Sequence, residues 1–377
     1  MPYDIPHTIS PSLWVLAWRR LRADRVAMIS LAIVAAFLVM MLLSATGLIA
    51  KDWGVESGVN YAPPSFLGAD LEQPKVAKET SPAQPAANDT PTPLDIKDPL
   101  ADALAEIRGQ SGQSAAASPD AVVDPLADVM AEIRAKGTAA AVVTARAATL
   151  PFGGDKWGRD VLKKTIKGSE TSIFVGLADA VVATLLGTIF GAIAGYYGKW
   201  VDDFFNWFYS VFTAMPSLLL IFAVAAVLQQ KGMLTIVLIL GLTGWTGVFR
   251  LIRGEYLKHK GREYVQAADA IGASNARRMF VHIFPNVSHV VLVQLSILTV
   301  GFIKAEVTLS FLGFGVPVDV VSWGSMLNEA QNELILGKWW QLVAATIAMA
   351  TLVTAFSLFT DALRDALDPK LKGRTGH

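Results

Sequence analysis

Six apolar stretches set the fold class of this chain. A helix that crosses a bilayer needs about 20 consecutive, mostly apolar residues. The sequence contains six stretches that approach or exceed this length: Val26–Leu48, Ile173–Tyr197, Phe204–Leu228, Met233–Phe249, His289–Thr308 and Trp339–Phe359. Because the backbone in lipid must satisfy its own hydrogen bonds, the pattern predicts an all-α integral membrane protein with six transmembrane helices. The first stretch is longer than the core of a signal peptide, so we expect an uncleaved anchor.

Composition agrees with a membrane protein and excludes several other classes. The 377 residues are 53% hydrophobic and 17% charged, and the formal net charge is zero, so no overall charge points to nucleic acid. The chain has no cysteine, and its five histidines lack the spacing of zinc ligands. No Gly-rich phosphate-binding loop precedes a helix. We therefore expect no cofactor, no metal and no catalytic residues, which makes an enzyme the weakest interpretation.

Lysine and arginine gather in three segments, residues 19–25, 250–278 and 364–374. With six spans these segments lie on one side of the membrane, and the short loops on the other side offer only Lys231 and Lys338. Cytoplasmic loops carry an excess of these residues. The distribution therefore predicts that both termini and the loop before the fifth span are cytoplasmic.

That loop contains a distinctive segment, Glu263–Asn286. Gly272 follows an Ala-rich helical turn and suits the left-handed residue that ends a helix. Ser274 can cap the next helix, and Pro285 is expected to end it. Two short helices joined by a glycine corner predict a knob on which a soluble partner can push. An ordinary hairpin between two spans is the alternative.

The segment resembles the EAA loop of permease subunits in bacterial ATP-binding-cassette importers. That pattern has Glu-Ala-Ala, three residues, Gly, and a Pro thirteen residues after the Gly; here 266–268, Gly272 and Pro285 keep the spacing. Gln266 replaces the family's Glu, and His282 and Phe284 replace its Ile and Leu. The resemblance implies that the loop, about 255–286, couples the spans to an ATPase. The residues expected to carry this coupling are Glu263, Gln266, Ala267, Ala268, Gly272 and Pro285.

Other stretches resemble the second permease subunit of dipeptide and oligopeptide importers. Gly154 and Val307 depart from that group's Thr and Ala. The similar stretches cover about 150–370 together with the first span: Gly153–Asp160, Ala194–Gly198, Glu306–Gly313, Trp323–Leu327 and Leu363–Pro369.

This resemblance implies a machine of several subunits in the bacterial inner membrane. The chain would be a non-catalytic permease beside a sister permease, two cytoplasmic ATPases and an extracytoplasmic substrate-binding protein. It would import di- or oligopeptides; nickel, a sugar or an opine-like solute is the alternative within the class. A secondary transporter with Asp179, Lys304 and Glu306 as a proton relay is the alternative from a different class.

Residues within the spans suggest packing and pathway roles. Gly187, Gly191 and Gly195 stand four apart, a spacing that lets helices approach closely in lipid. Lys304 and Glu306 lie toward the outer end of the fifth span. They are candidates for the pathway or for a contact between subunits, and the alternative is that Lys304 snorkels to the outer headgroups.

Two further expectations for single residues concern the second and third spans. Asp179 lies near the start of the second span and is expected to be only shallowly buried. Pro216 is expected to kink the third span.

The segment 51–149 departs from the resemblance. Ala62–Ser65 and Leu150–Gly153 look like pieces that lie close together in a shorter loop. Between them, Asp98–Arg108 recurs as Asp124–Arg134, each with an Asp-Pro start and an apolar stripe at helical spacing. Such short helices are marginal in water. The insertion is predicted to be a mostly disordered extracytoplasmic tether, and a docking arm for a partner is the alternative.

The predicted organisation has five parts. Residues 1–25 are a cytoplasmic segment, 26–48 the first span and 49–152 an extracytoplasmic loop. Residues 153–370 form a domain with five spans and the EAA loop, and 371–377 are a cytoplasmic tail.

Overall fold

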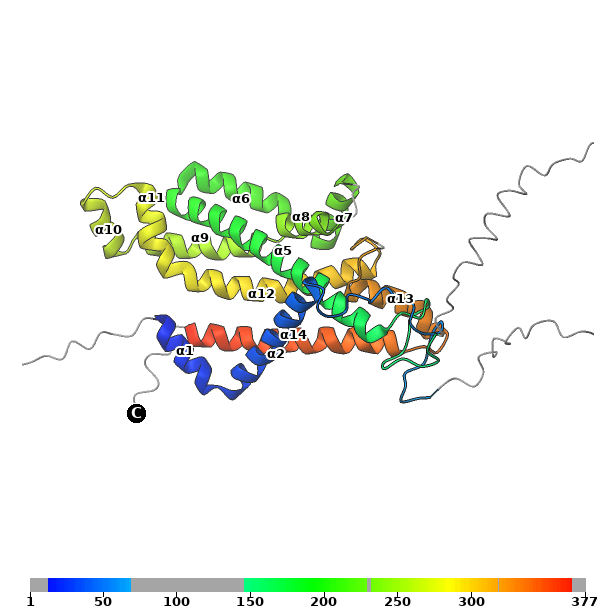
Figure 1. Ribbon diagram of the computed structural model, residues 1–377. Helices are drawn as coiled ribbons and strands as arrows, with labels where there is room; N and C mark the ends of the chain where they lie inside the picture. The colour runs from blue at the N-terminus through cyan, green and yellow to red at the C-terminus, as the bar shows by residue number, and fades with distance from the viewer. Residues whose placement is uncertain (1–12, 69–145, 229–231, 318, 368–377) are drawn as a thin grey trace, which may run out of the picture. The chain divides into compact units, whose positions relative to one another are not determined.

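The computed structural model describes residues 13–68, 146–228, 232–317 and 319–367. The regular secondary structure of these residues is helical, with β-type pairing only as isolated bridges (Figure 1). The duplicated Asp-Pro segments lie outside the described residues. The helices are α1 (Leu13–Ala23), α2 (Arg25–Ala45), α5 (Val161–Tyr197), α6 (Lys199–Thr213), α7 (Ser217–Leu228), α8 (Met233–Thr243), α9 (Thr246–Lys260), α10 (Glu263–Ala270), α11 (Asn275–Arg277), a π-helical turn (Arg278–Ile283), α12 (Phe284–Phe311), α13 (Trp323–Ile335) and α14 (Trp340–Leu367).

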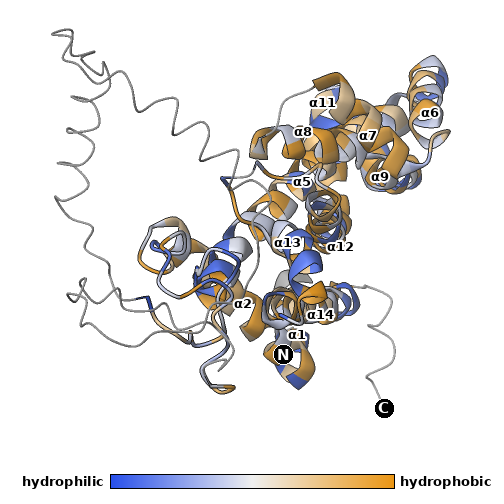
Figure 2. Cartoon of the chain, turned by 90° about the vertical axis from the view of Figure 1, so that its right-hand side faces the viewer, coloured by the Kyte–Doolittle hydropathy of each residue, from blue (hydrophilic) through white to orange (hydrophobic). Residues whose placement is uncertain are grey.

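Four helical segments are long and apolar enough to cross a membrane: α2, α5, the continuous helix Asn275–Phe311 and α14. Two bent pairs, α6 with α7 and α8 with α9, raise the number to six if each pair is one span. Apolar residues colour much of these helices in Figure 2. The chain is therefore an all-helical integral membrane protein, as its apolar stretches predict.

Helix α5 is longer than the predicted second span. The Asp160 carboxylate caps it by accepting hydrogen bonds from the backbone N–H groups of Leu162 (2.8 Å) and Lys163 (3.4 Å). Its 37 residues give a helix of roughly 55 Å, well beyond the roughly 30 Å of a hydrocarbon core. The first turns carry lysines, serines and a glutamate, so hydropathy alone does not detect them.

The third and fourth spans are both broken. Helices α6 and α7 meet at 90°, with Pro216 in the break, so the predicted kink is a sharp corner. Helices α8 and α9 meet at 42° next to Gly244. The helix continues beyond the predicted fourth span, which ends at Phe249, because α9 runs to Lys260. The break between α6 and α7 is explained by Pro216, because proline has no backbone N–H to donate to the preceding turn of a helix.

Helices α5, α12 and α14 connect two ends of the bundle. One end holds α10, α11, α1 and the last turns of α14, and the other holds α13 and the flanking loops (Figure 1). At the first end, α1 packs on α14 through Ala17 and Leu21 against Leu363 and Ala366. Sequence analysis did not predict α1, whose eleven residues carry three arginines.

At the second end, the two pieces that flank the insertion lie side by side. The Ser65 N–H donates to the Leu150 carbonyl (2.8 Å), and the Gly154 N–H donates to the Ala62 carbonyl (2.7 Å). The Trp340 indole N–H donates to the Gly154 carbonyl (2.7 Å). The expected closeness of these pieces is confirmed, so the insertion leaves and returns at one joined base.

Candidate functional site

Helices α10 and α11 with residues 271–274 form a knob at one end of the bundle (Figure 1). Gly272 has φ +79°, and its N–H donates to the Asp269 carbonyl at 2.9 Å. The Ser274 hydroxyl then caps α11 by accepting from the Arg277 N–H (3.3 Å). No atom lies within 4 Å of a Cβ built at Gly272. The corner therefore requires glycine for its left-handed backbone rather than for space.

The underside of the knob is fixed to two spanning helices. The Tyr196 hydroxyl at the end of α5 donates to Oδ1 of Asn275 (3.0 Å). The Tyr256 hydroxyl of α9 donates to the Met279 carbonyl (3.3 Å). Val265 and Met279 are buried in the same apolar cluster as these two tyrosines. A displacement of the knob is therefore transmitted to α5, α9 and α12 through packed contacts.

The corner of the knob is uncovered. Ile271 is 84% exposed, and Phe280 and Val281 of the π-helical turn that follows are more than half exposed. An ion pair between Arg278 and Asp269 links the two sides of the corner. Of the residues expected to carry coupling, Ala268 is buried, while Glu263, Gln266, Ala267, Gly272 and Pro285 are exposed.

The expectation that Pro285 ends the second short helix is wrong. Pro285 occupies the first turn of α12, and the helix from Asn275 continues to Phe311. A π-helical turn, Arg278–Ile283, directly precedes it. Proline is tolerated in the first turn of a helix, where its missing N–H has no required partner. The knob is thus rigidly continuous with the fifth span.

Helices α5 and α9 approach closely along the three glycines of α5. A Cβ at Gly187, Gly191 or Gly195 would lie 2.6–2.7 Å from the nearest atom of α9. Next to this ridge, Arg253 of α9 makes a two-pronged ion pair with Asp202 of α6, with Nε–Oδ1 at 2.5 Å and Nη2–Oδ2 at 2.6 Å. Sequence analysis used Arg253 only for orientation and missed this pair.

Lys304 and Glu306 lie on different faces of α12. Glu306 is fully buried, and its Oε1 accepts a hydrogen bond from the Ser310 hydroxyl (2.7 Å). The Glu306 side chain is thus enclosed by this chain itself, and its expected role in the pathway or at a contact between subunits stays a prediction. Lys304 is exposed. Side chains two residues apart along a helix point in different directions, so the two charges do not face one another.

Asp179 is also enclosed by neighbouring helices. It lies eighteen residues after the start of α5 at Val161, roughly 27 Å along the helix, and it is fully buried. Both carboxylate oxygens lack a hydrogen-bond partner among the described residues. The side chain is thus enclosed by the protein itself, and the expectation that Asp179 lies near the membrane surface stays a prediction.

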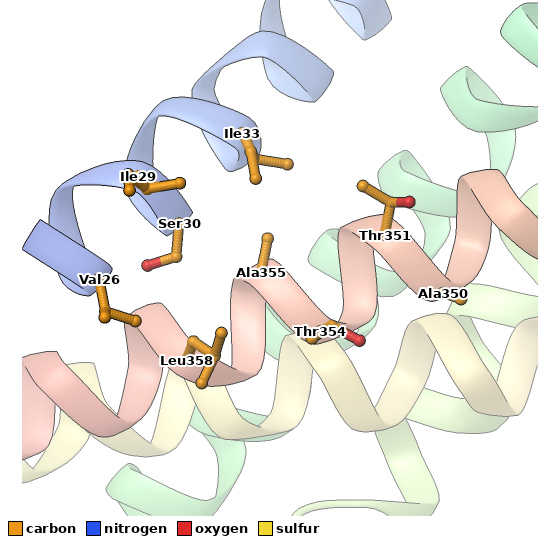
Figure 3. A pocket seen from close by; sticks show the side chains of 9 residues that line it. All are labelled: Val26, Ile29, Ser30, Ile33, Ala350, Thr351, Thr354, Ala355 and Leu358. Carbon is orange, nitrogen blue, oxygen red and sulfur yellow. The ribbon is translucent and has the colours of Figure 1, made fainter.

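Two cavities lie along the spans. One, of about 410 Å³, is formed where the broken helices meet α12 and is lined by Thr213, Ser217, Thr243, Thr246, Gly301 and Ala305 among others. The second, about 440 Å³, is a groove between α2 and α14 with aliphatic and hydroxyl side chains from both helices (Figure 3). The lining of the groove has no charged side chain, which suits hydrocarbon rather than a charged solute. We refer to the cavity of about 410 Å³, where the broken helices meet α12, as the helix-break cavity.

A buried ionic network at the opposite end from the knob was not predicted. The Lys164 ammonium lies 2.8 Å from the Asp155 carboxylate and 2.5 Å from the Glu329 carboxylate. Gln341 accepts from the same ammonium at 3.3 Å and donates to Glu329 at 3.1 Å. Asp155 belongs to the stretch 153–160 noted above, but nothing in that stretch names its distant partners. The network joins the loop, α5, α13 and α14.

Comparison with known proteins places the chain in a family. Residues 187–373 match the family model "Binding-protein-dependent transport system inner membrane component", and residues 12–64 match "N-terminal TM domain of oligopeptide transport permease C". The two matches flank and exclude most of the insertion.

Several relatives are similar to more than half of the chain. The chain is 37% identical over 221 residues to the dipeptide transport system permease protein DppC of Bacillus subtilis, covering 59% of this chain and 69% of that protein. It is 38% identical to the oligopeptide transport system permease protein OppC of the same organism, covering 59% and 72%. It is 34% identical to the glutathione transport system permease protein GsiD of Pectobacterium atrosepticum, covering 59% and 73%. The chain therefore belongs to the family of inner-membrane permease components of binding-protein-dependent transport systems.

Proposed function

We propose that this chain is a transmembrane permease subunit of an ATP-driven importer of di- and oligopeptides. The observation that carries the proposal is the knob, which is exposed on one surface and attached on the other to three membrane helices. The names of the dipeptide, oligopeptide and glutathione relatives support peptides as the substrate class.

The proposed complex contains a sister permease, two ATPase subunits on the cytoplasmic side and an extracytoplasmic binding protein. The knob would insert into the ATPase surface, and ATP hydrolysis would take place on those partners. Ile271 at the corner is 84% exposed, so its apolar side chain is available to a protein partner.

We propose that the knob, α1 and the end of α14 face the cytoplasm. Helix α1, the last turn of α9, α11 and the last turn of α14 lie at this end (Figure 1), and each of them carries lysine or arginine from the basic segments. Cytoplasmic loops are enriched in lysine and arginine. The insertion between residues 69 and 145 would then be extracytoplasmic, where a binding protein approaches.

Closure of the ATPases would push the knob and rearrange the spans as a rigid body. The π-helical turn and α12 form one continuous helix with the knob, so a displacement at α11 must move the fifth span or break packed contacts. A nucleotide-dependent contact at the knob can therefore bias two states of the membrane domain.

Two other functions remain as alternatives. Permeases that import nickel, a sugar or an opine-like solute would share this architecture. A secondary transporter would need a chain of titratable groups; Asp179 and Glu306 are buried, whereas Lys304 is on another face of α12.

Reconstitution of the whole complex in proteoliposomes tests the proposal. We expect uptake of labelled tetraalanine that requires the binding protein and ATP, and no uptake with ATPase subunits unable to hydrolyse ATP. Uptake driven by a pH gradient without ATP would contradict the importer and favour the secondary transporter. ATP-driven uptake of nickel or sugar but not of peptide would contradict the substrate class.

A further inference from the structure

Lys304 is an exposed cation on a membrane-spanning helix. Among the described residues it has no ion-pair partner. It lies in the centre of a stripe of α12 that the rest of the chain leaves uncovered. The stripe consists of Ile297, Gly301, Lys304, Thr308 and Phe311.

The direction of α12 argues against simple snorkelling of Lys304 to the nearer end of the helix. Lys304 lies seven residues before the last residue, Phe311, roughly 10 Å along the axis. Side chains of a helix lean toward its N-terminus. The lysine stem is therefore directed away from the Phe311 end and over Gly301, which has no side chain to obstruct it.

Gly301 connects this stripe to the helix-break cavity, because it is exposed and also lines that cavity. The cavity is lined by the hydroxyl groups of Thr213, Ser217, Thr243 and Thr246, and by no charged side chain. A cation therefore stands at the rim of a mainly apolar, uncharged cavity that offers four hydroxyl groups.

We propose that Lys304 determines specificity by binding a carboxylate of the peptide as it passes through the membrane domain. The inference rests on the proposed function. A cation in a low-dielectric setting needs a counter-charge. A peptide supplies that charge at its C-terminus or on an acidic side chain, while its uncharged backbone suits the hydroxyl groups of the cavity.

Uptake of three tetrapeptides by the reconstituted complex tests this role. The probes are tetraalanine, its C-terminal amide, and the amide of Ala-Asp-Ala-Ala. The preference for tetraalanine over its amide is compared between wild type and Lys304→Met, so that the contribution of the unchanged binding protein cancels. We expect this preference to fall about tenfold in Lys304→Met, the loss of one charge-assisted hydrogen bond, and to be retained in Lys304→Arg.

The third peptide identifies the source of the carboxylate. If the preference for the aspartate-containing amide over the tetraalanine amide also falls in Lys304→Met, Lys304 binds either kind of carboxylate. If that preference is unchanged in Lys304→Met, Lys304 binds the C-terminal carboxylate. Both outcomes support the proposal.

A second variant leaves the lysine in place. No atom lies within 4 Å of a Cβ at Gly301, so Gly301→Leu should fold while it blocks the path from Lys304 to the cavity. We expect the same loss of preference as in Lys304→Met. Thr308→Val, one turn further along the stripe, is the matched control and should keep the wild-type preference.

Two results would overturn the proposal. One is an unchanged preference in Lys304→Met and Gly301→Leu. The other is loss of the sister permease from the purified Lys304→Met complex, which would assign the lysine to a contact between subunits. Failure of the wild-type complex to take up any of the three peptides with ATP would instead overturn the proposed function, and with it a peptide as the ligand of Lys304.

Discussion

Tyr196 and Asn275 join the longest membrane helix to the knob, with the tyrosine hydroxyl 3.0 Å from the Asn275 side-chain oxygen. Tyr196 is the second-last residue of α5, and Asn275 is the first residue of α11. The same asparagine also accepts from the Arg278 guanidinium. The start of α11 is thus held in place directly by a spanning helix, so the corner at Gly272 stands between this fixed point and α10.

The first prediction concerns that corner. Gly272→Val should disturb residues 271–274, because a left-handed backbone costs about 1–2 kcal/mol for a residue with a side chain and is especially unfavourable for a β-branched one. We expect the number of peptides transported per ATP hydrolysed to fall severalfold in the reconstituted complex. Gly272→Asn is the matched control, since asparagine tolerates this conformation. Equal coupling in wild type and Gly272→Val would show that the corner does not transmit motion.

A second prediction concerns the contact of α5 with α9. A Cβ at Gly191 would lie 2.7 Å from the Phe249 carbonyl oxygen and 3.0 Å from the Arg253 backbone nitrogen. Backbone atoms cannot move aside cheaply, so Gly191→Ala should destabilise the protein by about 1–3 kcal/mol, measured as a lower melting temperature in detergent. Gly254→Ala on α9 has no atom within 4 Å and should be neutral or stabilising. Similar melting temperatures for both variants would contradict close packing.

The sequence predicts local backbone conformation well where a single residue type determines it. Gly272 follows a helical turn and takes a positive φ, as a helix-ending glycine should. Pro285 has an equally strong local signal, but its effect depends on the turn before it. Since that turn is π-helical and Pro285 starts α12, the proline continues the helix instead of ending it.

Features that depend on distant residues could not be predicted in the same way. Lys164 is 165 residues from Glu329, its ion-pair partner, and no sequence pattern links the two. Helix α13 alternates Trp323 and Met326 with polar residues over a short length, so it resembles a loop in hydropathy. The separation of Lys304 and Glu306, in contrast, follows from helix geometry and could have been deduced.

The third prediction concerns the buried network. Lys164→Met would leave the carboxylates of Asp155 and Glu329 without their cation, and breaking a buried pair typically costs about 3–5 kcal/mol. We expect the melting temperature to fall by about 10 °C. The adjacent Lys163 pairs with Asp52 at the surface, at 2.5 Å, so Lys163→Met should cost less than about 1 kcal/mol. A fall of the same size in both variants would contradict the assigned importance of burial.

The last prediction concerns Glu333, a buried carboxyl of α13 beside this network. Its pKa is raised from an ordinary 4.5 to about 7: burial raises it most, the Lys164 ammonium lowers it, and the carboxylates of Asp155 and Glu329 raise it. Below pH 4.5 the carboxyl is protonated in both folded and unfolded protein. As the pH rises toward 7, the unfolded chain releases the proton while the folded protein keeps it, so the folded protein loses stability, by about 3 kcal/mol in total.

Glu333→Gln should remove this dependence, because an amide cannot release the proton. We expect its melting temperature to decline less than that of the wild type between pH 5 and pH 8, and to exceed the wild-type value at pH 8. Glu263→Gln, which removes an exposed carboxylate of the knob, is the control and should keep the wild-type decline. If Glu333→Gln declined as steeply as the wild type, the loss of stability would come from other groups, and Glu333 would be charged in the folded protein at pH 5.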